Sequence, residues 1–166
     1  MGLERFSAAW REGYVTSVSA EENAREGVEC VFCVLGTEPV DESTGVLRQS
    51  QYSYVVLNAF PYGSGHLLVV PRRHVDSLEE LEIEEYSDLF LLMRDAVTAL
   101  KRAYEPDGMN LGLNLGHAAG AGIPKHLHAH ALPRWNGDTN FMTTIGETRV
   151  LPESLQVTWQ KVHAHL

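Results

Sequence analysis

Three histidines alternate with small or apolar residues in the segment His126-Leu127-His128-Ala129-His130-Ala131-Leu132. Strict alternation predicts an extended strand, because successive side chains of a strand point to opposite faces. We therefore expect the three imidazoles on one face, with neighbours about 6–7 Å apart at a rise of ~3.3 Å per residue. A ring whose pKa lies near neutrality suits a nucleophile, a proton donor or a metal ligand. The alternative, a half-buried strand face of hydrogen-bonded histidines, would be an unusual way to build a core.

Size and charge narrow the range of partners. The 166 residues fit one domain with a substantial core, and 13 Lys and Arg against 22 Asp and Glu give a net charge of −9. This charge disfavours nucleic acid as a partner, because binding to its backbone needs many cationic contacts. A small anionic ligand needs only a local set of donors. No apolar run approaches the ~20 residues of a membrane-spanning helix. The segment Met1–Trp10 has neither the basic flank nor the apolar stretch of a secretory signal, so we expect a cytoplasmic protein without a membrane partner.

Strand signals follow in the middle of the chain. The β-branched and aromatic residues of Tyr52–Asn58 predict a strand, and His66–Val70 predict a second that stops at Pro71. The glycine- and proline-rich segment 60–65 predicts the turn that joins them in a hairpin. Apolar residues alternate with polar residues and glycine over Met109–Leu115, which predicts a third strand.

One long helix is predicted between these strands. Ser77 and Glu80 have the spacing of a capping box, and Pro106 and Gly108 end the helical pattern. The apolar residues between them recur at helical spacing: Tyr86, Leu89, Phe90, Met93, Val97, Leu100 and Tyr104. We expect this helix to pack on the sheet.

Shorter elements complete the prediction. Helices are expected near Leu3–Arg11 and, opened by Pro152, near Glu153–His163, while segments 36–45 and 116–124 are expected to be loops. Strands, one long helix and further strands together predict an α+β domain around an antiparallel sheet.

The histidine segment matches the pattern His-φ-His-φ-His-φ-φ, with φ apolar, at every position. Together with the run GAGIPKHLHAHALPRWNGDTNF at 120–141, it resembles the histidine triad (HIT) superfamily of nucleotide hydrolases and transferases, in the bacterial branch related to diadenosine tetraphosphate phosphorylases and hydrolases. The resemblance divides the chain into an N-terminal extension, 1–27, and a HIT domain, 28–166. It implies about five antiparallel strands, one long helix and a C-terminal helix. It also implies a homodimer paired through the long helix and a strand.

The resemblance implies a covalent mechanism. His128 would attack the α-phosphorus of a nucleotide and carry the nucleotidyl group, which water or phosphate then releases. His130 would contact the phosphate and assist the leaving group, and His66 would orient the site. A neutral imidazole is nucleophilic near pH 7, so this chemistry needs no metal.

Substrate-binding residues are implied in the same way. Asn58 would contact the ribose region, and Asn114 would bind phosphate together with the backbone around Gly120 and Gly122. The simpler alternatives are a strand-end turn residue for Asn58 and an exposed alternating position for Asn114. Many relatives have Gln, then Ser or Thr, where this chain has Gly122 and Ile123. We therefore expect Trp135, Asn136 or Asp138 to contribute to substrate choice.

The two cysteines form the pair Cys30-x-x-Cys33, which in a cytosolic chain indicates metal binding or redox chemistry. The resemblance implies a structural zinc site of Cys30, Cys33, His74 and His126, a tetrahedral set without an open position. Two reduced cysteines beside a buried Phe32 are the simpler alternative, and a thioredoxin-like pair is disfavoured because no βαβ pattern surrounds it. His117 is a second choice for a zinc ligand. His163 and His165 are assigned no role.

The sequence thus predicts an enzyme that acts on a small nucleotide, with structural zinc and no organic cofactor. The first hypothesis is a hydrolase or phosphorylase of dinucleoside polyphosphates. Its alternatives are a nucleotidyl transferase or nucleoside phosphoramidase, a nucleotide-binding regulatory module without turnover, and a hydrolase centred on a catalytic metal.

Overall fold

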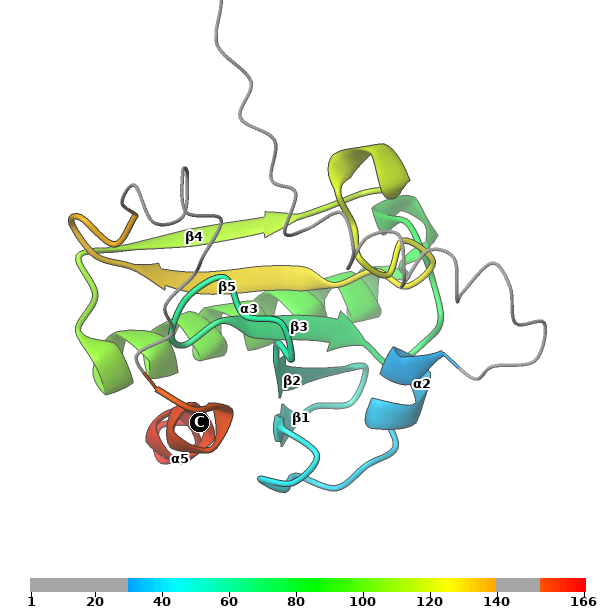
Figure 1. Cartoon of the computed structure of the whole chain (residues 1–166). Helices are drawn as coiled ribbons and strands as arrows, with labels where there is room; N and C mark the ends of the chain where they lie inside the picture. Colours follow the sequence, from blue (N-terminus) through cyan, green and yellow to red (C-terminus); the bar gives the residue numbers. More distant parts are fainter. Residues whose placement is uncertain (1–29, 140–152) are drawn as a thin grey trace, which may run out of the picture.

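The computed structural model describes residues 30–139 and 153–166 (Figure 1). The predicted helix at Leu3–Arg11 lies outside these residues, and the division into 1–27 and 28–166 stays a prediction. Among the described residues, no helix is both long enough and apolar enough to cross a bilayer.

A five-stranded antiparallel sheet forms the centre of the domain, in the order β1-β2-β3-β5-β4. The predicted α+β class is therefore confirmed. The strands are β1 (Val46–Gln49), β2 (Ser53–Leu57), β3 (Leu67–Pro71), β4 (Gly108–Leu113) and β5 (Ala129–Arg134). The predicted hairpin is the β2–β3 pair, although β3 includes Pro71, which pairs with Ser53 at the strand end. A proline is tolerated at this end position because the ladder need not continue beyond it.

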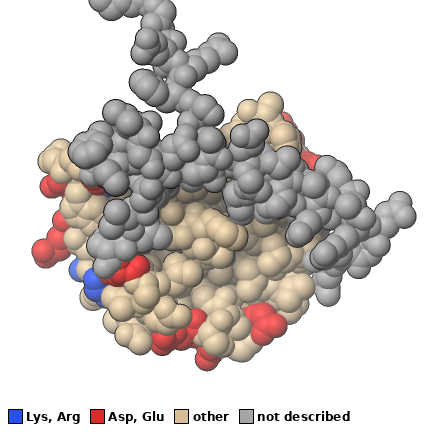
Figure 2. All heavy atoms as spheres, in the orientation of Figure 1, with Lys and Arg blue, Asp and Glu red and all other residues tan. Residues whose placement is uncertain are grey.

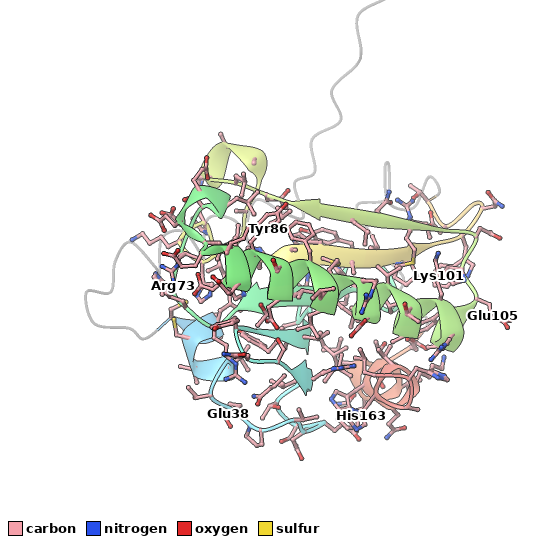
Figure 3. All side chains as sticks on the ribbon, turned by 180° about the vertical axis from the view of Figure 1, so that it is seen from behind. Glu38, Arg73, Tyr86, Lys101, Glu105 and His163 are labelled. Carbon is pink, nitrogen blue, oxygen red and sulfur yellow. The ribbon has the colours of Figure 1, made fainter. Side chains whose placement is uncertain are left out.

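Both faces of the central strands are covered, so β2 and β3 are buried at every position. On one face lies α3 (Ile83–Tyr104), with α5 (Leu155–His163) beside it, as Figure 3 shows from behind. On the other face the short helix α2 (Val31–Leu35) packs through Phe32 against Tyr54 and Leu68. The histidine strand β5 lies between β3 and β4, so its side chains reach both neighbouring strands.

The predicted capping box at Ser77 and Glu80 is wrong. These residues belong to a short 3₁₀ turn, Leu78–Glu80, in which the Ser77 side chain makes no capping hydrogen bond. The long helix begins at Ile83 instead, where the Glu85 carboxylate accepts from the backbone N–H of Glu82 at 2.9 Å. Arg73 holds the same carboxylate at 2.6 Å, and this long-range ion pair could not be read from local spacing.

Two short elements were not predicted. Strand β1 has only four residues, with a register irregularity against β2, and α2 has only five. A helix of this length is unstable alone, but the hydroxyl of Tyr54 donates to the backbone carbonyl of Phe32 at 2.7 Å and anchors it. The C-terminal helix begins at Leu155, two residues later than Glu153, because the Ser154 side chain accepts from Val157 N–H as its N-cap.

Candidate active site and metal centre

The three alternating histidines divide between two sites. Regular pairing of β5 begins at Ala129, so His126 and His128 lie just before the strand and only His130 lies within it. The ring centroids of His128 and His130 are 5.1 Å apart, closer than the expected 6–7 Å. His126 instead faces the two cysteines.

His128 is held in one protonation pattern. Its Nδ1 lies 2.7 Å from the backbone carbonyl of His126. A carbonyl can only accept, so Nδ1 carries the proton and Nε2 keeps its lone pair. The side chain is buried, and desolvation lowers the pKa of His128 below its ordinary value. At neutral pH the ring is therefore an uncharged imidazole with a free nucleophilic nitrogen.

His66 and His130 are hydrogen-bonded to each other. His66 is buried at the end of the turn that leads into β3, and its Nε2 lies 2.9 Å from Nδ1 of His130. The backbone N–H of Tyr62 donates to Nδ1 of His66 at 3.0 Å. The Tyr62 ring stacks on His130 with 5.8 Å between centroids and an interplanar angle of 19°. The Asn114 side-chain amide lies 3.4 Å from the other ring nitrogen of His130.

A pocket opens beside these histidines, on the sheet face opposite α3. Its polar lining includes His128, His130 and Asn58, and its apolar wall comes largely from α2 and from β2 with the turn that follows it. The lining residues are Val31, Phe32, Leu35, Leu57, Asn58, Ala59, Phe60, Tyr62, Leu68, Gly122, Ile123, His128 and His130. Figure 2 shows the surface from this side; the visible described residues are mostly uncharged, with acidic groups near the edge.

Not every predicted substrate-binding residue lines this pocket. Gly122 does, whereas Gly120 caps the 3₁₀ turn His117–Ala119 with a φ of +84°. Trp135 lies beyond the far end of β5, in edge-on contact with Tyr104 at 6.0 Å. The roles of these residues stay predictions. The sequence did not point to Tyr62, and it gave Phe32 only a role in the core. Phe32 lies within the Cys30-x-x-Cys33 motif, and Tyr62 lies within the predicted turn 60–65.

The four predicted metal ligands converge. Their ligand atoms, from Cys30, Cys33, His74 and His126, all lie within 4.8 Å of one another. Nδ1 of His126 is 3.3 Å from Sγ of Cys30, and Nδ1 of His74 is 3.2 Å from Sγ of Cys33. Tetrahedral zinc with Zn–S of ~2.3 Å and Zn–N of ~2.0 Å separates S and N ligands by about 3.5 Å, so this donor set fits zinc.

The backbone also prepares His126 to bind a metal. Its Nε2 lies 2.9 Å from the carbonyl of Pro71, so Nε2 carries the proton and Nδ1 keeps its lone pair toward the thiols. Such a carbonyl contact commonly orients a metal-bound histidine. His117, the alternative ligand, is not part of the cluster found among the described residues.

A HIT domain matches residues 41–137, more than half of the chain. The chain belongs to the HIT family. This HIT protein is 44% identical over 118 residues to an "AP-4-A phosphorylase" of Mycobacterium tuberculosis strain H37Rv, an alignment that covers 71% of this chain and 60% of that protein. It is 32% identical over 93 residues to the "Bis(5'-nucleosyl)-tetraphosphatase [asymmetrical]" of Schizosaccharomyces pombe, which covers 56% of this chain and 50% of the other.

Solved structures share the HIT fold. A zinc-bound histidine triad family protein from Mycobacterium smegmatis superimposes with a TM-score of 0.66 at 23% identity, covering 82% of this chain and 92% of that one. A "hypothetical histidine triad nucleotide-binding protein" from Sulfolobus tokodaii superimposes with a TM-score of 0.64 at 23% identity, covering 82% of this chain and 91% of that one. At 23% identity, the likeness to these two structures establishes the fold alone. The chain spans about 60% of the length of the AP-4-A phosphorylase relatives.

Proposed function

We propose that this HIT protein cleaves dinucleoside polyphosphates, such as diadenosine tetraphosphate, through a covalent nucleotidyl-histidine intermediate. One observation carries the proposal: the bond from His128 Nδ1–H to the carbonyl of His126 leaves the unprotonated Nε2 on a ring that lines the pocket. The similarity to an AP-4-A phosphorylase and a tetraphosphatase supports this substrate class.

In the proposed reaction, Nε2 of His128 attacks the α-phosphorus and forms an N–P bond. The P–O bond to the remaining polyphosphate breaks, and that group leaves with the electron pair. Water or inorganic phosphate then attacks the same phosphorus, breaks the N–P bond and returns the imidazole to its neutral state. The water or phosphate loses its proton, and a mononucleotide or a nucleoside diphosphate is released.

The neighbouring groups stabilise charge on the phosphates. Among the described residues that line the pocket there is no lysine or arginine, so the donors are neutral N–H groups. His130 lies beside the nucleophile, with its Nε2 near the Asn114 amide. We assign His130 to the phosphate and leaving oxygens, Asn114 and the backbone around Gly120 and Gly122 to the phosphates, and Trp135 to substrate choice. Prealigned donors of this kind stabilise developing charge without reorganisation.

We propose that Cys30, Cys33, His74 and His126 hold a structural zinc ion, which when bound would tie α2 to the segments that flank β3 and β5. Four protein ligands complete a tetrahedral shell, so no coordination position remains for a reacting water. Neither Cys30 nor Cys33 forms a disulfide, and reduced cysteines of this kind fit a reducing compartment such as the cytoplasm.

We also propose a homodimer paired through β4 and α3. Strand β4 is a largely exposed edge strand, and Leu111 on it is 53% exposed. On α3, the rings of Tyr86 and Phe90 contact each other with centroids 4.7 Å apart and remain partly exposed, although the helical pattern placed both on the apolar face. Tyr86 is labelled in Figure 3. Among the described residues β4 pairs only with β5, and an edge strand and a helix that both expose apolar side chains are surfaces suited to a second copy.

The test is product analysis with diadenosine tetraphosphate, in buffers with and without inorganic phosphate. ADP plus ATP would identify phosphorolysis, and AMP plus ATP would identify hydrolysis. Intact-mass measurement during rapid quench should show one added nucleotidyl group, which the His128→Ala variant lacks while it still binds nucleotide. Turnover at the wild-type rate in that variant, or an adduct on another side chain, would refute the mechanism.

A further inference from the structure

Tyr62 contacts both of the histidines that flank the proposed nucleophile, His66 and His130. Its backbone N–H donates to Nδ1 of His66 at 3.0 Å. The centroid of its ring lies 4.5 Å from that of His66 and 5.8 Å from that of His130. The ring also lines the pocket. One residue of the turn between β2 and β3 therefore reaches the two imidazoles through different atoms.

The backbone contact sets the direction of the hydrogen bond between the two histidines. A backbone N–H can only donate, so Nδ1 of His66 accepts and the proton of the neutral ring lies on Nε2. This Nε2 lies 2.9 Å from Nδ1 of His130, and His66 therefore donates to His130. The nitrogen of His130 that remains for the substrate is Nε2. Because the donor is a backbone group, this direction does not depend on the side chain at position 62.

The Tyr62 side chain supplies a second restraint on His130. A hydrogen bond holds one atom of a ring and leaves the ring able to pivot about that atom. The Tyr62 ring lies almost parallel to the His130 ring, with 19° between the planes, in the offset stacking that aromatic pairs favour. A flat surface against the face of His130 opposes this pivot. His130 is only half-buried, so this contact is one of the few that limit its orientation.

We propose that Tyr62 is a positioning residue whose aromatic face, rather than its hydroxyl group, holds His130 in the orientation in which Nε2 can donate to the substrate. The proposal rests on the proposed function of the same site, in which His130 serves the phosphate and leaving oxygens. Without the ring, His130 pivots about its bond to His66 and its free nitrogen moves out of line. A tyrosine in a pocket wall could instead bind substrate through its hydroxyl group, and the two roles predict different results for Tyr62→Phe.

Three variants that all keep the backbone N–H separate the ring from the hydroxyl group. With diadenosine tetraphosphate, Tyr62→Phe should keep kcat and KM within about threefold of wild type. Tyr62→Leu and Tyr62→Met should each lower kcat about tenfold and leave KM within about threefold, because a displaced proton donor slows the step after binding. Two aliphatic variants guard against one that fails to fold. The matched control is Tyr52→Leu, between β1 and β2 and outside the pocket lining, which should keep the wild-type kcat.

Nitrogen NMR of the ¹⁵N-histidine-labelled protein measures the same geometry without substrate. A scalar coupling across the hydrogen bond from His66 Nε2–H to His130 Nδ1 should be present in wild type and in Tyr62→Phe. The coupling should weaken or disappear in Tyr62→Leu and Tyr62→Met. The Nδ1–H signal of His128, which donates to the carbonyl of His126, should stay unchanged in all three variants and is the internal control for the fold of the site.

The outcomes separate this proposal from the proposed function. Wild-type kcat and coupling in the aliphatic variants would overturn the positioning role and leave the proposed function standing. A loss in Tyr62→Phe as large as that in Tyr62→Leu, or a rise in KM in any of the three, would overturn it by assigning Tyr62 to substrate binding. A shift of the His128 signal together with the lost coupling would overturn it by showing a general structural role. Coupling that is lost only in the aliphatic variants of a protein that cleaves no dinucleoside polyphosphate would uphold the positioning and refute the proposed function.

Discussion

His128 and His126 are joined by one short hydrogen bond, from Nδ1–H of the first ring to the backbone carbonyl of the second residue, 2.7 Å away. The phenyl ring of Phe32 contacts both imidazoles, with centroid distances of 5.5 Å to His126 and 5.0 Å to His128. Phe32 itself lies between the two cysteines in the chain. The proposed nucleophile His128 is therefore linked to the proposed zinc ligand His126 by this hydrogen bond and by their common contact with Phe32. A change at one site should disturb the other.

Cys33→Ser should lose zinc and loosen α2. We expect less than one zinc per chain by elemental analysis and, for a loss of roughly 3 kcal/mol, a midpoint of thermal unfolding lower by about 6–12 °C. Nucleotide affinity should fall as well, because Phe32 lines the pocket. The control is His117→Ala, which lies outside the cluster and should keep its zinc. Full zinc content in Cys33→Ser would refute the ligand set.

Gly65→Ala should destabilise the turn that carries His66. The φ of Gly65 is +74°, and a Cβ there would lie 2.8 Å from Cγ of Pro133 and 3.0 Å from Cε2 of Tyr104. Strain and overpacking together should lower the free energy of unfolding by about 2–4 kcal/mol in urea titrations. Gly137→Ala separates the two causes, since φ is +78° there but nothing lies within 4 Å, and about 1 kcal/mol is expected. Equal losses in both variants would mean that the close contacts carry no cost.

The Arg73–Glu85 pair should give a defined pH dependence of stability. Arg73 hydrogen-bonds the carboxylate and lowers the pKa of Glu85 to about 2. Because the folded pKa lies below the unfolded value, the stabilisation is complete above about pH 4.5 and is lost as the pH falls toward 2. Glu85→Gln should cost about 1–2 kcal/mol at pH 7 and much less near pH 2. Glu84→Gln, an exposed neighbour on α3, should leave stability nearly unchanged at both pH values. A Glu85→Gln cost that is the same at both ends of this range would contradict the assignment.

Leu111→Glu should weaken the proposed dimer. It places a charge on the exposed face of β4, and a twofold axis would bring two such charges together. We expect the dissociation constant in sedimentation velocity to rise at least about tenfold, which corresponds to about 1.4 kcal/mol. Val157→Glu is the control, because this exposed residue lies on α5, away from the edge strand. A wild-type protein that stays monomeric at high concentration would refute the interface.

Much of the architecture could be predicted from local pattern. The helical period between Tyr86 and Tyr104 identified α3, and the alternation over residues 126–132 identified a strand, although of the three histidines only His130 lies within it. These predictions succeed because side-chain direction in a helix or strand repeats within a few residues. The start of α3 at Ile83 and the short helix α2 could not be predicted, since each depends on a partner from another part of the fold, Arg73 for α3 and Tyr54 for α2.

The sequence by itself determined which residue types could do the chemistry: three alternating histidines, a Cys-x-x-Cys pair, and an apolar helical repeat long enough to cover a sheet. Only the tertiary structure decided which site each histidine joins. His126 contacts Cys30, which is 96 residues away in the sequence, and His130 is hydrogen-bonded to His66, which is 64 residues away. It also decided which nitrogen of His126 and of His128 bears the proton, because each ring contacts a backbone carbonyl. Protonation follows the donors and acceptors that touch a ring, and folding brings these together from distant parts of the chain.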